Sequence, residues 1–382
     1  MSVIPVIPEI ASKVEPGQLK QLARHSREVL KAGQAKSGAI VACPTFEVYR
    51  YSWLRDGSFC AYALDLAGDG AEGAAFHRWV GRVVGRYEQK VDSAIQRYRA
   101  GEKLTDADFL NTRYTLDGSE EEGHDWWNFQ LDGYGTWLWA VSRHFELFPD
   151  NQLKAELQKS VEIVVRYLAA FWQLPNYDCW EENREGVHPS TLAALYGGLK
   201  AAAMLYSESP VCRAGRKQSG AIAAFVKSNG LHQDSLIKTV GLNEVDASLL
   251  GAAMPYGLFP RRGKLMRATI ARIEQELTSP QGGVYRYRRD VYYGGGEWVL
   301  LTAWLGWYYE SAGRREEAQS CLNWVAQQAD FAGNLPEQVA HNLLSPIHLP
   351  GWEERWGKSA SPLLWSHAMY LILYTALYGE ID

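Results

Sequence analysis

Two glutamates in separate loops are the residues of this sequence best suited to chemistry. Glu181 stands between Trp180 and Glu182, and Glu337 lies much later, in the proline-containing segment 334–338. Hydrolysis of a glycosidic bond needs two carboxyl groups, one on each side of the scissile bond. A tryptophan beside one of them would add a flat surface on which a sugar ring can stack. The pattern therefore predicts sugar-hydrolysing chemistry.

Aromatic residues stand beside charged residues at further points of the chain, which has 15 tryptophans and 21 tyrosines. A large core would use some of them, but such clusters also suit a pyranose, which has apolar faces and polar edges. The Arg55-Asp56 pair in segment 49–56 is either an ion pair at a helix start or a clamp on sugar hydroxyls, since charged groups bind hydroxyls strongly. Segment 286–298 is either a tyrosine-rich surface loop or a second wall of the same site.

The overall composition excludes several functions. The net charge is −5 and no basic stripe is present, which argues against a nucleic-acid partner. Five scattered cysteines without CxxC spacing are typical of a reduced, cytoplasmic protein. The first residues lack the features of a signal peptide, and no stretch has the ~18 apolar residues of a membrane span. We therefore expect a cytoplasmic protein with no membrane partner; its oligomeric state is left open.

Motifs for metals, cofactors and other nucleophiles are weak. Nine histidines show no HxxxH or HExxH spacing, so we expect no metal. The GxGxxG pattern at 68–73 follows a helical rather than a strand pattern, so it predicts a turn and no nucleotide cofactor. Cys179 has no nearby histidine to activate it as a nucleophile. His367 is expected to be a packed histidine.

Helical periodicity dominates the chain and predicts one all-α domain, a toroid of twelve paired helices over residues 1–382, with short β-hairpins in loops. Residues 39–42 and 284–287 are candidate hairpin strands. Ser190 and Asp246 are expected helix N-caps. No linker-like segment divides the pattern. The expected helices span 16–32, 57–67, 74–99, 132–147, 151–172, 190–208, 211–228, 246–254, 263–277, 297–311, 314–329 and 361–379.

With these motifs placed, the chain resembles glycoside hydrolase family 15, the glucoamylase family, from about Tyr49 to His367. The resemblance implies an (α/α)6 barrel and an inverting, exo-acting enzyme that removes one glucose from a non-reducing end. It implies no starch-binding module and no N-terminal β-sandwich domain within this chain. It also implies a set of substrate-binding residues: Tyr49, Tyr51, Trp53, Arg55, Asp56, Trp126, Trp127, Gln130, Trp180, Glu182, Arg286, Tyr292, Glu297 and Trp298.

The resemblance further implies that Glu181 is the general acid and Glu337 the general base. Glu181 must then keep its proton near neutral pH, whereas Glu337 stays ionised and activates a water molecule. Inversion predicts a carboxyl separation of about 6.5–9.5 Å, which leaves room for that water. Tyr49 is a candidate to stabilise the oxocarbenium-like transition state.

The substrate expectation rests on departures from the family pattern. Glu297, and Asn183-Arg184 after the double glutamate, are expected to face the leaving-group sugar, which favours short α-1,6-linked oligosaccharides such as isomaltose. The alternatives are α-1,4-linked maltooligosaccharides, trehalose, and a sugar-binding sensor without catalysis. A polysaccharide lyase fits less well, because the chain is acidic and offers paired glutamates rather than a basic cleft.

Overall fold

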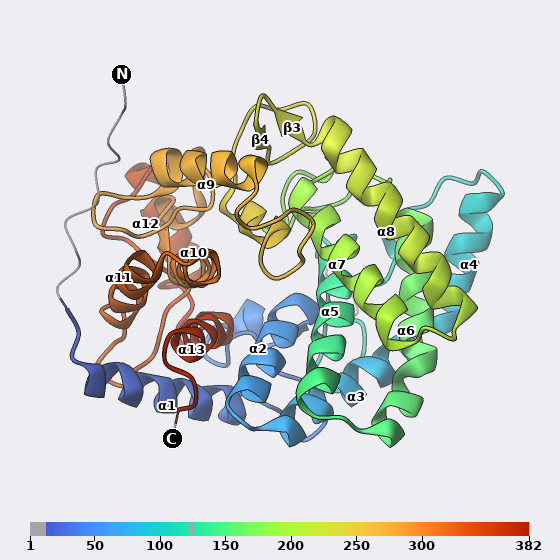
Figure 1. The fold of residues 1–382 in the computed structure, drawn as a ribbon, viewed down its shortest axis with the longest axis horizontal. Coiled ribbons are helices and arrows are strands. Elements are labelled where there is room, and N and C mark those ends of the chain that lie inside the picture. The colour runs from blue at the N-terminus through green and yellow to red at the C-terminus, as the bar shows by residue number, and fades with distance from the viewer. Residues whose placement is uncertain (1–12, 122–125, 382) are drawn as a thin grey trace.

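A closed ring of helices forms the centre of the molecule. The computed structural model describes residues 13–121 and 126–381. Neighbouring members of the ring contact one another and the last contacts the first, so the ring closes (Figure 1). In chain order, its members in the described residues are α2 (Leu54–Leu66), α5 (Asp132–Leu147), α7 (Pro189–Leu205), the 3-10 helix η3 (Ala247–Ala252), α10 (Val299–Ala312) and α13 (Leu364–Tyr378).

A second ring of helices surrounds the first, and the chain alternates strictly between the two. This alternation confirms the predicted (α/α)6 barrel. Among the described residues, two further α-helices, α4 (Glu88–Arg99) and α12 (Leu349–Trp356), lie outside the alternation, as do several short 3-10 helices. The outer ring consists of α1 (Pro16–Ala32), α3 (Gly70–Arg86), α6 (Asn151–Phe171), α8 (Pro210–Asn229), α9 (Lys264–Leu277) and α11 (Arg315–Ala326).

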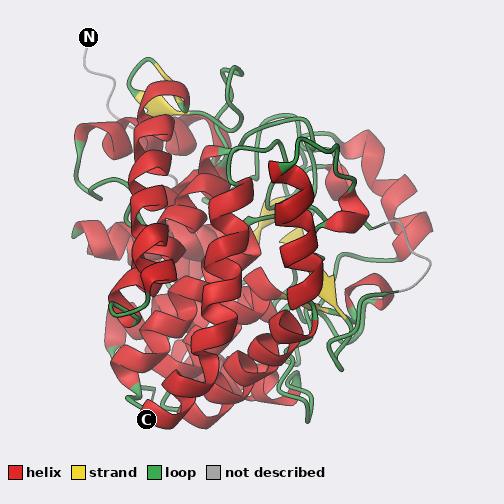
Figure 2. Cartoon of the chain, turned by 90° about the vertical axis from the view of Figure 1, so that its right-hand side faces the viewer, coloured by secondary structure: helices red, strands yellow, loops and turns green. Residues whose placement is uncertain are grey.

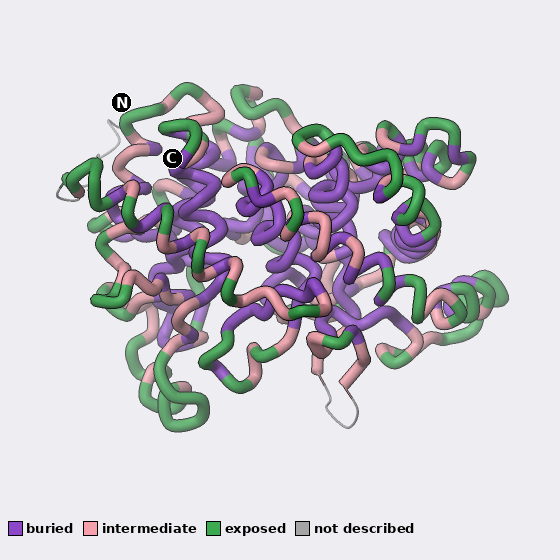
Figure 3. The backbone as a smooth tube through the Cα atoms, turned by 90° about the horizontal axis from the view of Figure 1, so that it is seen from below, coloured by how far each residue is buried: buried purple, intermediate pink, exposed green. Residues whose placement is uncertain are grey.

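The distribution of apolar residues explains the two rings. Residues 299–309 of α10 and 364–374 of α13 are all buried, and a helix that is apolar all round must lie inside. Outer helices such as α6 bury one face only and leave charged residues in solvent. Figure 3 shows this as buried segments in the interior and exposed segments at the periphery.

Glycines let two inner helices come unusually close. A Cβ on Gly198 of α7 would lie 2.2 Å from the carbonyl oxygen of Gly135 on α5, and a Cβ on Gly135 would lie 2.6 Å from the Ala194 carbonyl. Both distances are far below van der Waals contact, so only glycine fits at either position. This close packing fixes α5 relative to α7, and the loop that precedes α7 carries Glu181.

Short antiparallel strand pairs join loops that are distant in sequence (Figure 2). β1 (Ser52–Trp53) pairs with β2 (Arg113–Tyr114), and β5 (Glu297–Trp298) pairs with β6 (Gln338–Val339). A third pair, β3 (Leu231–His232) and β4 (Ser235–Leu236), is a local hairpin. The strands expected at 39–42 and 284–287 are wrong, because Ile40 and Val284 form only isolated bridges.

The helix boundaries differ from the predictions at several points. The expected helix 74–99 breaks at Tyr87, whose ring packs 5.7 Å from Tyr114 and whose hydroxyl accepts from the backbone N–H of Glu120. A tertiary contact thus overrides a continuous helical pattern. Segment 246–254 contains a 3-10 helix rather than an α-helix, although Asp246 caps it as expected by accepting from Ser248. The cap of α7 is His188, not Ser190.

Two other differences have a local cause. α12 was not predicted because its sequence begins with Leu-Pro-Gly, which indicates a loop, yet proline is tolerated in the first turn of a helix. The 68–73 pattern is only partly a turn, since α3 begins at Gly70. Within the described residues, no helix has both the length and the apolar character needed to cross a membrane.

Candidate active site

Most of the predicted site residues gather around the N-terminal ends of the inner helices. Trp53 directly precedes α2 and Trp298 directly precedes α10, while Gln130 lies just before α5. Glu181 lies in the loop between α6 and α7, and Glu337 directly precedes β6. Since inner helices of an alternating barrel all run in the same direction, their N-terminal ends meet at one end of the ring.

The Glu181 carboxylate is held by Trp53. The indole Nε1 of Trp53 donates to Oε1 of Glu181 at 2.6 Å. Desolvation raises the pKa of Glu181, while Arg55, Trp53 and Gln130 act in the opposite direction. The backbone of Glu181 has φ 66°, a left-handed conformation that is uncommon for a non-glycine residue. Such strained backbone is typical of functional loops that their surroundings hold in place.

The element that holds this loop is a buried charge network that the sequence did not reveal. Asp178 accepts from the backbone N–H groups of Trp180 and Glu182, each at 3.0 Å. Nζ of Lys238 lies 3.4 Å from Asp178 and 2.9 Å from Asp246. Asp246 in turn accepts from the indole of Trp180. One buried lysine therefore bridges two carboxylates that together fix the Glu181 loop.

Glu182 joins this loop to the 286–298 segment. Arg286 lies 3.2 Å from Glu182, and the Tyr287 hydroxyl donates to the same carboxylate at 2.5 Å. Arg286 is also held by Asp290, and its guanidinium lies 5.0 Å from the ring centre of Trp298. The interpretation of this segment as a surface loop is therefore wrong, since Arg286 and Trp298 are buried.

Glu337 is buried beneath two tyrosines. The Tyr49 hydroxyl donates to Oε1 of Glu337 at 3.1 Å and lies 2.9 Å from the Tyr292 hydroxyl, which donates to it in turn. Oε2 of Glu337 has no hydrogen-bond partner. That oxygen is therefore available to accept a proton.

The protonation of Glu337 differs from the expectation. Burial raises its pKa to about 8, Arg286 and Tyr49 act in the opposite direction, and Asp56 raises it further. A pKa of about 8 favours the protonated form of Glu337 at neutral pH, whereas the sequence argument expected it to be ionised. The reason is that Arg286 is paired with Asp290 and Glu182, so its charge does not offset the cost of burying the Glu337 carboxylate.

The backbone just before Glu337 is fixed by α13. Nε2 of His367 accepts from the backbone N–H of Leu335 at 2.9 Å, and the Ser366 hydroxyl donates to the carbonyl of Pro336. The other ring nitrogen of His367 contacts Ser26. His367 is thus a packed histidine, as expected, and it positions the segment that carries Glu337.

Arg55 and Asp56 lie together at the start of α2, and Arg55 is also bound to Asp132 at 3.1 Å and to Gln130 at 3.2 Å. Burial raises the pKa of Asp56 to about 6, against the effect of Arg55. Oδ2 of Asp56 is buried and lies 3.4 Å from Nε of Arg55, but it accepts no hydrogen bond. Because this ion pair leaves Oδ2 able to accept a hydrogen bond, a clamp for hydroxyl groups is favoured over a simple helix-start ion pair.

Arg113, which belongs to no motif selected from the sequence, forms another wall. Its guanidinium lies 3.6 Å from the ring centre of Trp126 and 4.1 Å from that of Tyr51. The β1–β2 pairing, which sets Trp53 opposite Arg113, delivers it there. Trp127 packs against Trp126 but is 47% exposed, which places it at the rim.

Three residues expected to face a leaving-group sugar are engaged elsewhere. Glu297 precedes Trp298 in a strand, so its side chain points to the opposite face, where it accepts from Asn342 and packs against Gly283. Arg184 binds Asp106 and the Pro175 carbonyl, and Asn183 donates to Asp178. The structure therefore does not place these three side chains beside Glu181 and Glu337.

Comparison with known proteins identifies relatives of this chain. A family model described as glycosyl hydrolases family 15 matches residues 19–338. An isomaltose glucohydrolase from Kribbella flavida is 43% identical over 364 residues, which cover 94% of this chain and 93% of the relative.

Solved structures agree with the family match. A wild-type glycosidase superimposes with a TM-score of 0.92 at 40% identity, over 96% of this chain and 100% of its own. A glycosidase variant with a glutamate replaced by alanine, solved in complex with glucose, matches equally well. A bacterial glucoamylase in complex with acarbose shares the fold, with a TM-score of 0.73 at 21% identity over 94% of this chain and 56% of its own.

Proposed function

This chain belongs to glycosyl hydrolase family 15, and from that premise we propose that it releases β-glucose from the non-reducing end of short α-1,6-linked oligosaccharides, with isomaltose as the preferred substrate. The observation that carries the proposal is the 43% identity to an isomaltose glucohydrolase over nearly the full length of both chains. The site is compatible with this substrate, because it combines a buried carboxyl group, Glu337, and a partly buried one, Glu181, with aromatic walls.

Glu181 is the proposed general acid. Its Oε1 already accepts the indole N–H of Trp53, so the proton of the neutral acid resides on Oε2. Transfer of that proton to the glycosidic oxygen allows the bond from the anomeric carbon to this oxygen to break. Desolvation raises the pKa of Glu181, which favours the protonated form until the proton is transferred to the leaving oxygen.

Glu337 is the proposed general base. Its Oε1 is occupied by Tyr49, and its unpartnered Oε2 can remove a proton from a water molecule as that water attacks the anomeric carbon. After the reaction Glu337 holds the proton from water and Glu181 is ionised. Before the next cycle, Glu337 must release its proton to solvent and Glu181 must take one up from solvent. A buried base with a raised pKa is a strong proton acceptor once it is ionised.

Arg55, Asp56 and Arg286 are proposed to bind the hydroxyl groups of the terminal glucose. Oδ2 of Asp56 is ion-paired with Arg55 but accepts no hydrogen bond, and the two arginines are fixed by carboxylates that orient their remaining N–H groups. Trp180 and Trp298, with ring centres 5.3 Å apart, supply apolar surface beside these groups. A site that binds every edge of one terminal sugar favours exo-action.

Comparison of hydrolysis rates on isomaltose, maltose and trehalose tests the substrate. We expect the highest kcat/KM on isomaltose, and a higher value on maltose or trehalose would replace the proposed linkage by that of the better substrate. Following the product by NMR should show β-glucose first, whereas initial α-glucose would contradict inversion.

Two variants test the catalytic roles. Glu181→Gln and Glu337→Gln should each lower kcat by about 10²–10⁴-fold, the usual contribution of an acid or base. Glu316→Gln, an exposed carboxylate on α11, is the matched control and should keep normal turnover. If the wild type binds isomaltose without turnover, the sensor alternative is favoured instead.

A reducing compartment, the cytoplasm, is the proposed location. The five cysteines are all free and buried. Thiol titration of the denatured protein from its native source should find five free thiols per chain, and a smaller number would contradict this location.

A further inference from the structure

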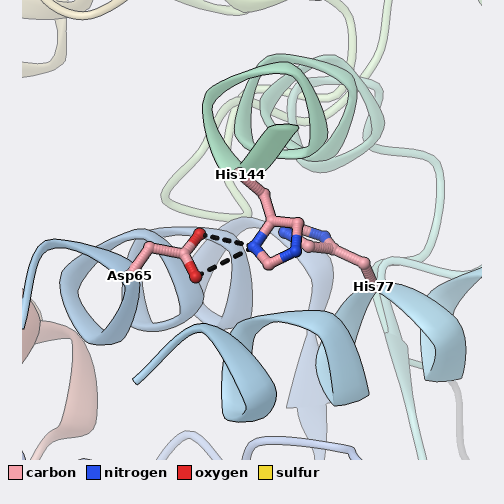
Figure 4. A group of neighbouring side chains, drawn as sticks. All are labelled: Asp65, His77 and His144. Carbon is pink, nitrogen blue, oxygen red and sulfur yellow. Dashed lines mark hydrogen bonds and ion pairs between the residues drawn. The ribbon is translucent and has the colours of Figure 1, made fainter. Parts of the chain in front are cut away.

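A second cluster of polar side chains lies away from the carboxylates, at the opposite ends of two inner helices. Asp65 is near the C-terminal end of α2, His144 is near that of α5, and His77 lies on α3. Asp65 follows Asp56 by nine residues on α2, which corresponds to ~14 Å along the helix axis. The exposed fractions of Asp65, His77 and His144 are 3%, 0% and 1%. Figure 4 shows the three side chains converging from separate helices.

The hydrogen bonds of this cluster are incomplete. Nδ1 of His144 lies 2.9 and 3.0 Å from the two carboxylate oxygens of Asp65. The ring of His77 lies 5.1 Å from the ring of His144, yet neither nitrogen of His77 has a hydrogen-bond partner. A neutral imidazole has one donor and one acceptor, and burial of both without partners is rare in folded proteins. His77 therefore needs a partner of another kind.

The donor atoms are close enough to share a metal ion. One possible ligand atom from each of Asp65, His77 and His144 lies within 4.8 Å of the others. Tetrahedral zinc bonds of about 2.0–2.1 Å place ligand atoms roughly 3.3 Å apart, so modest side-chain rotations would complete the geometry. One carboxylate with two imidazoles is a donor set that suits Zn²⁺.

The packing of α3 makes room for this cluster. Gly73 and His77 are one turn apart on α3 and therefore share a face. A Cβ at position 73 would clash with the Asp65 carboxylate, so only glycine lets α3 come this close. The 68–73 glycine pattern thus includes the residue that admits the Asp65 carboxylate to the α2–α3 interface.

We propose that Asp65, His77 and His144 bind one Zn²⁺ ion, which ties outer helix α3 to inner helices α2 and α5. The remaining coordination position would be filled by water. The role is structural, because the cluster lies at the far ends of the helices from Glu181 and Glu337. Histidine spacing gave no sign of it, since each ligand lies on a different helix.

Zinc binding to the full-length protein tests the proposal. After the protein is stripped with a chelator and desalted, ZnCl₂ is titrated by calorimetry, and Tm is measured with and without zinc. We expect one Zn²⁺ per chain and a rise in Tm, because a ligand that binds only the folded state stabilises it. Failure of the stripped wild type to bind a stoichiometric ion, or to gain stability from zinc, would overturn the proposal.

Variants locate the site. His77→Leu keeps a side chain of apolar bulk but removes both nitrogens, so it should lose zinc binding and the zinc-dependent rise in Tm. His232→Ala removes an exposed imidazole on β3 and should bind zinc as the wild type does. If His77→Leu does not fold, Asp65→Asn, which replaces one carboxylate oxygen by an amide nitrogen, is used in its place to test zinc binding. Full zinc affinity in the folded variant used would overturn the assignment.

Discussion

The indole N–H of Trp53 donates a hydrogen bond of 2.6 Å to the Glu181 carboxylate. The two residues lie on different loops, and the bond fixes which carboxylate oxygen is free to carry a proton. Because a donor stabilises the ionised form, Trp53 also lowers the pKa of Glu181 against the larger effect of burial.

Trp53→Phe should therefore change both rate and pH dependence. Loss of the donor raises the pKa of Glu181, so the acid stays protonated to higher pH and the alkaline limb of kcat moves upward. The carboxylate also loses its orientation, and we expect kcat to fall by about tenfold, equivalent to about 1.4 kcal/mol. Trp172→Phe is the matched control, since Trp172 is buried and donates to Gln218 away from the site. An unmoved alkaline limb in Trp53→Phe would remove Trp53 from this role.

Glu337→Gln should stabilise the protein, and more so at higher pH. Burial raises the pKa of Glu337 from 4.5 to about 8, so between these values the folded state keeps a proton that the unfolded chain has released. Stability from this group therefore falls as pH rises through that window. The amide does not titrate, so the gain in Tm over wild type should be small at about pH 5 and larger at about pH 8.5. An equal gain at both pH values would show that the carboxyl titrates normally.

Lys238→Met should disrupt the charge network that holds the Glu181 loop. Removal of one partner of a buried ion pair costs about 3–5 kcal/mol, and here two carboxylates lose their cation. We expect a lower free energy of unfolding and, in the protein that remains folded, a lower kcat. Lys264→Met removes an exposed lysine paired with Asp234 and should change stability by less than about 0.5 kcal/mol. Similar urea midpoints for the two variants would contradict the importance of the network.

Gly198→Ala should lower the stability of the protein, whereas Gly220→Ala should raise it. The methyl group at position 198 would overlap the Gly135 carbonyl, and overpacking of this kind costs about 1–3 kcal/mol or more. Position 220 is within helix α8 with open space around it, so alanine there should stabilise by roughly 0.5–1 kcal/mol. Thermal unfolding of both variants checks the pair, and a stable Gly198→Ala would mean that α5 and α7 can move apart.

Much of the fold follows from local pattern. Inner helices such as α10 and α13 are apolar on nearly every side and outer helices such as α6 on one side only, so this part of the pattern can be read from the sequence. The departures occur where a distant contact decides a local conformation, as at Tyr87, which ends α3 because it packs on Tyr114. The strands were missed because each has only two residues, too few for a period to be recognised.

The sequence by itself determined the reactive groups: the double glutamate at 181–182, Glu337, and the aromatic and arginine motifs in the family's order. Only the tertiary structure decided which of them meet, because the strand pairings and the barrel bring Arg113 and Lys238 to the site from segments without a motif. The β5–β6 pairing turns the Glu297 side chain away from the site, since successive residues of a strand face opposite sides. The protonation of Glu337 was likewise beyond the sequence, because its pKa depends on burial and on which carboxylate holds Arg286.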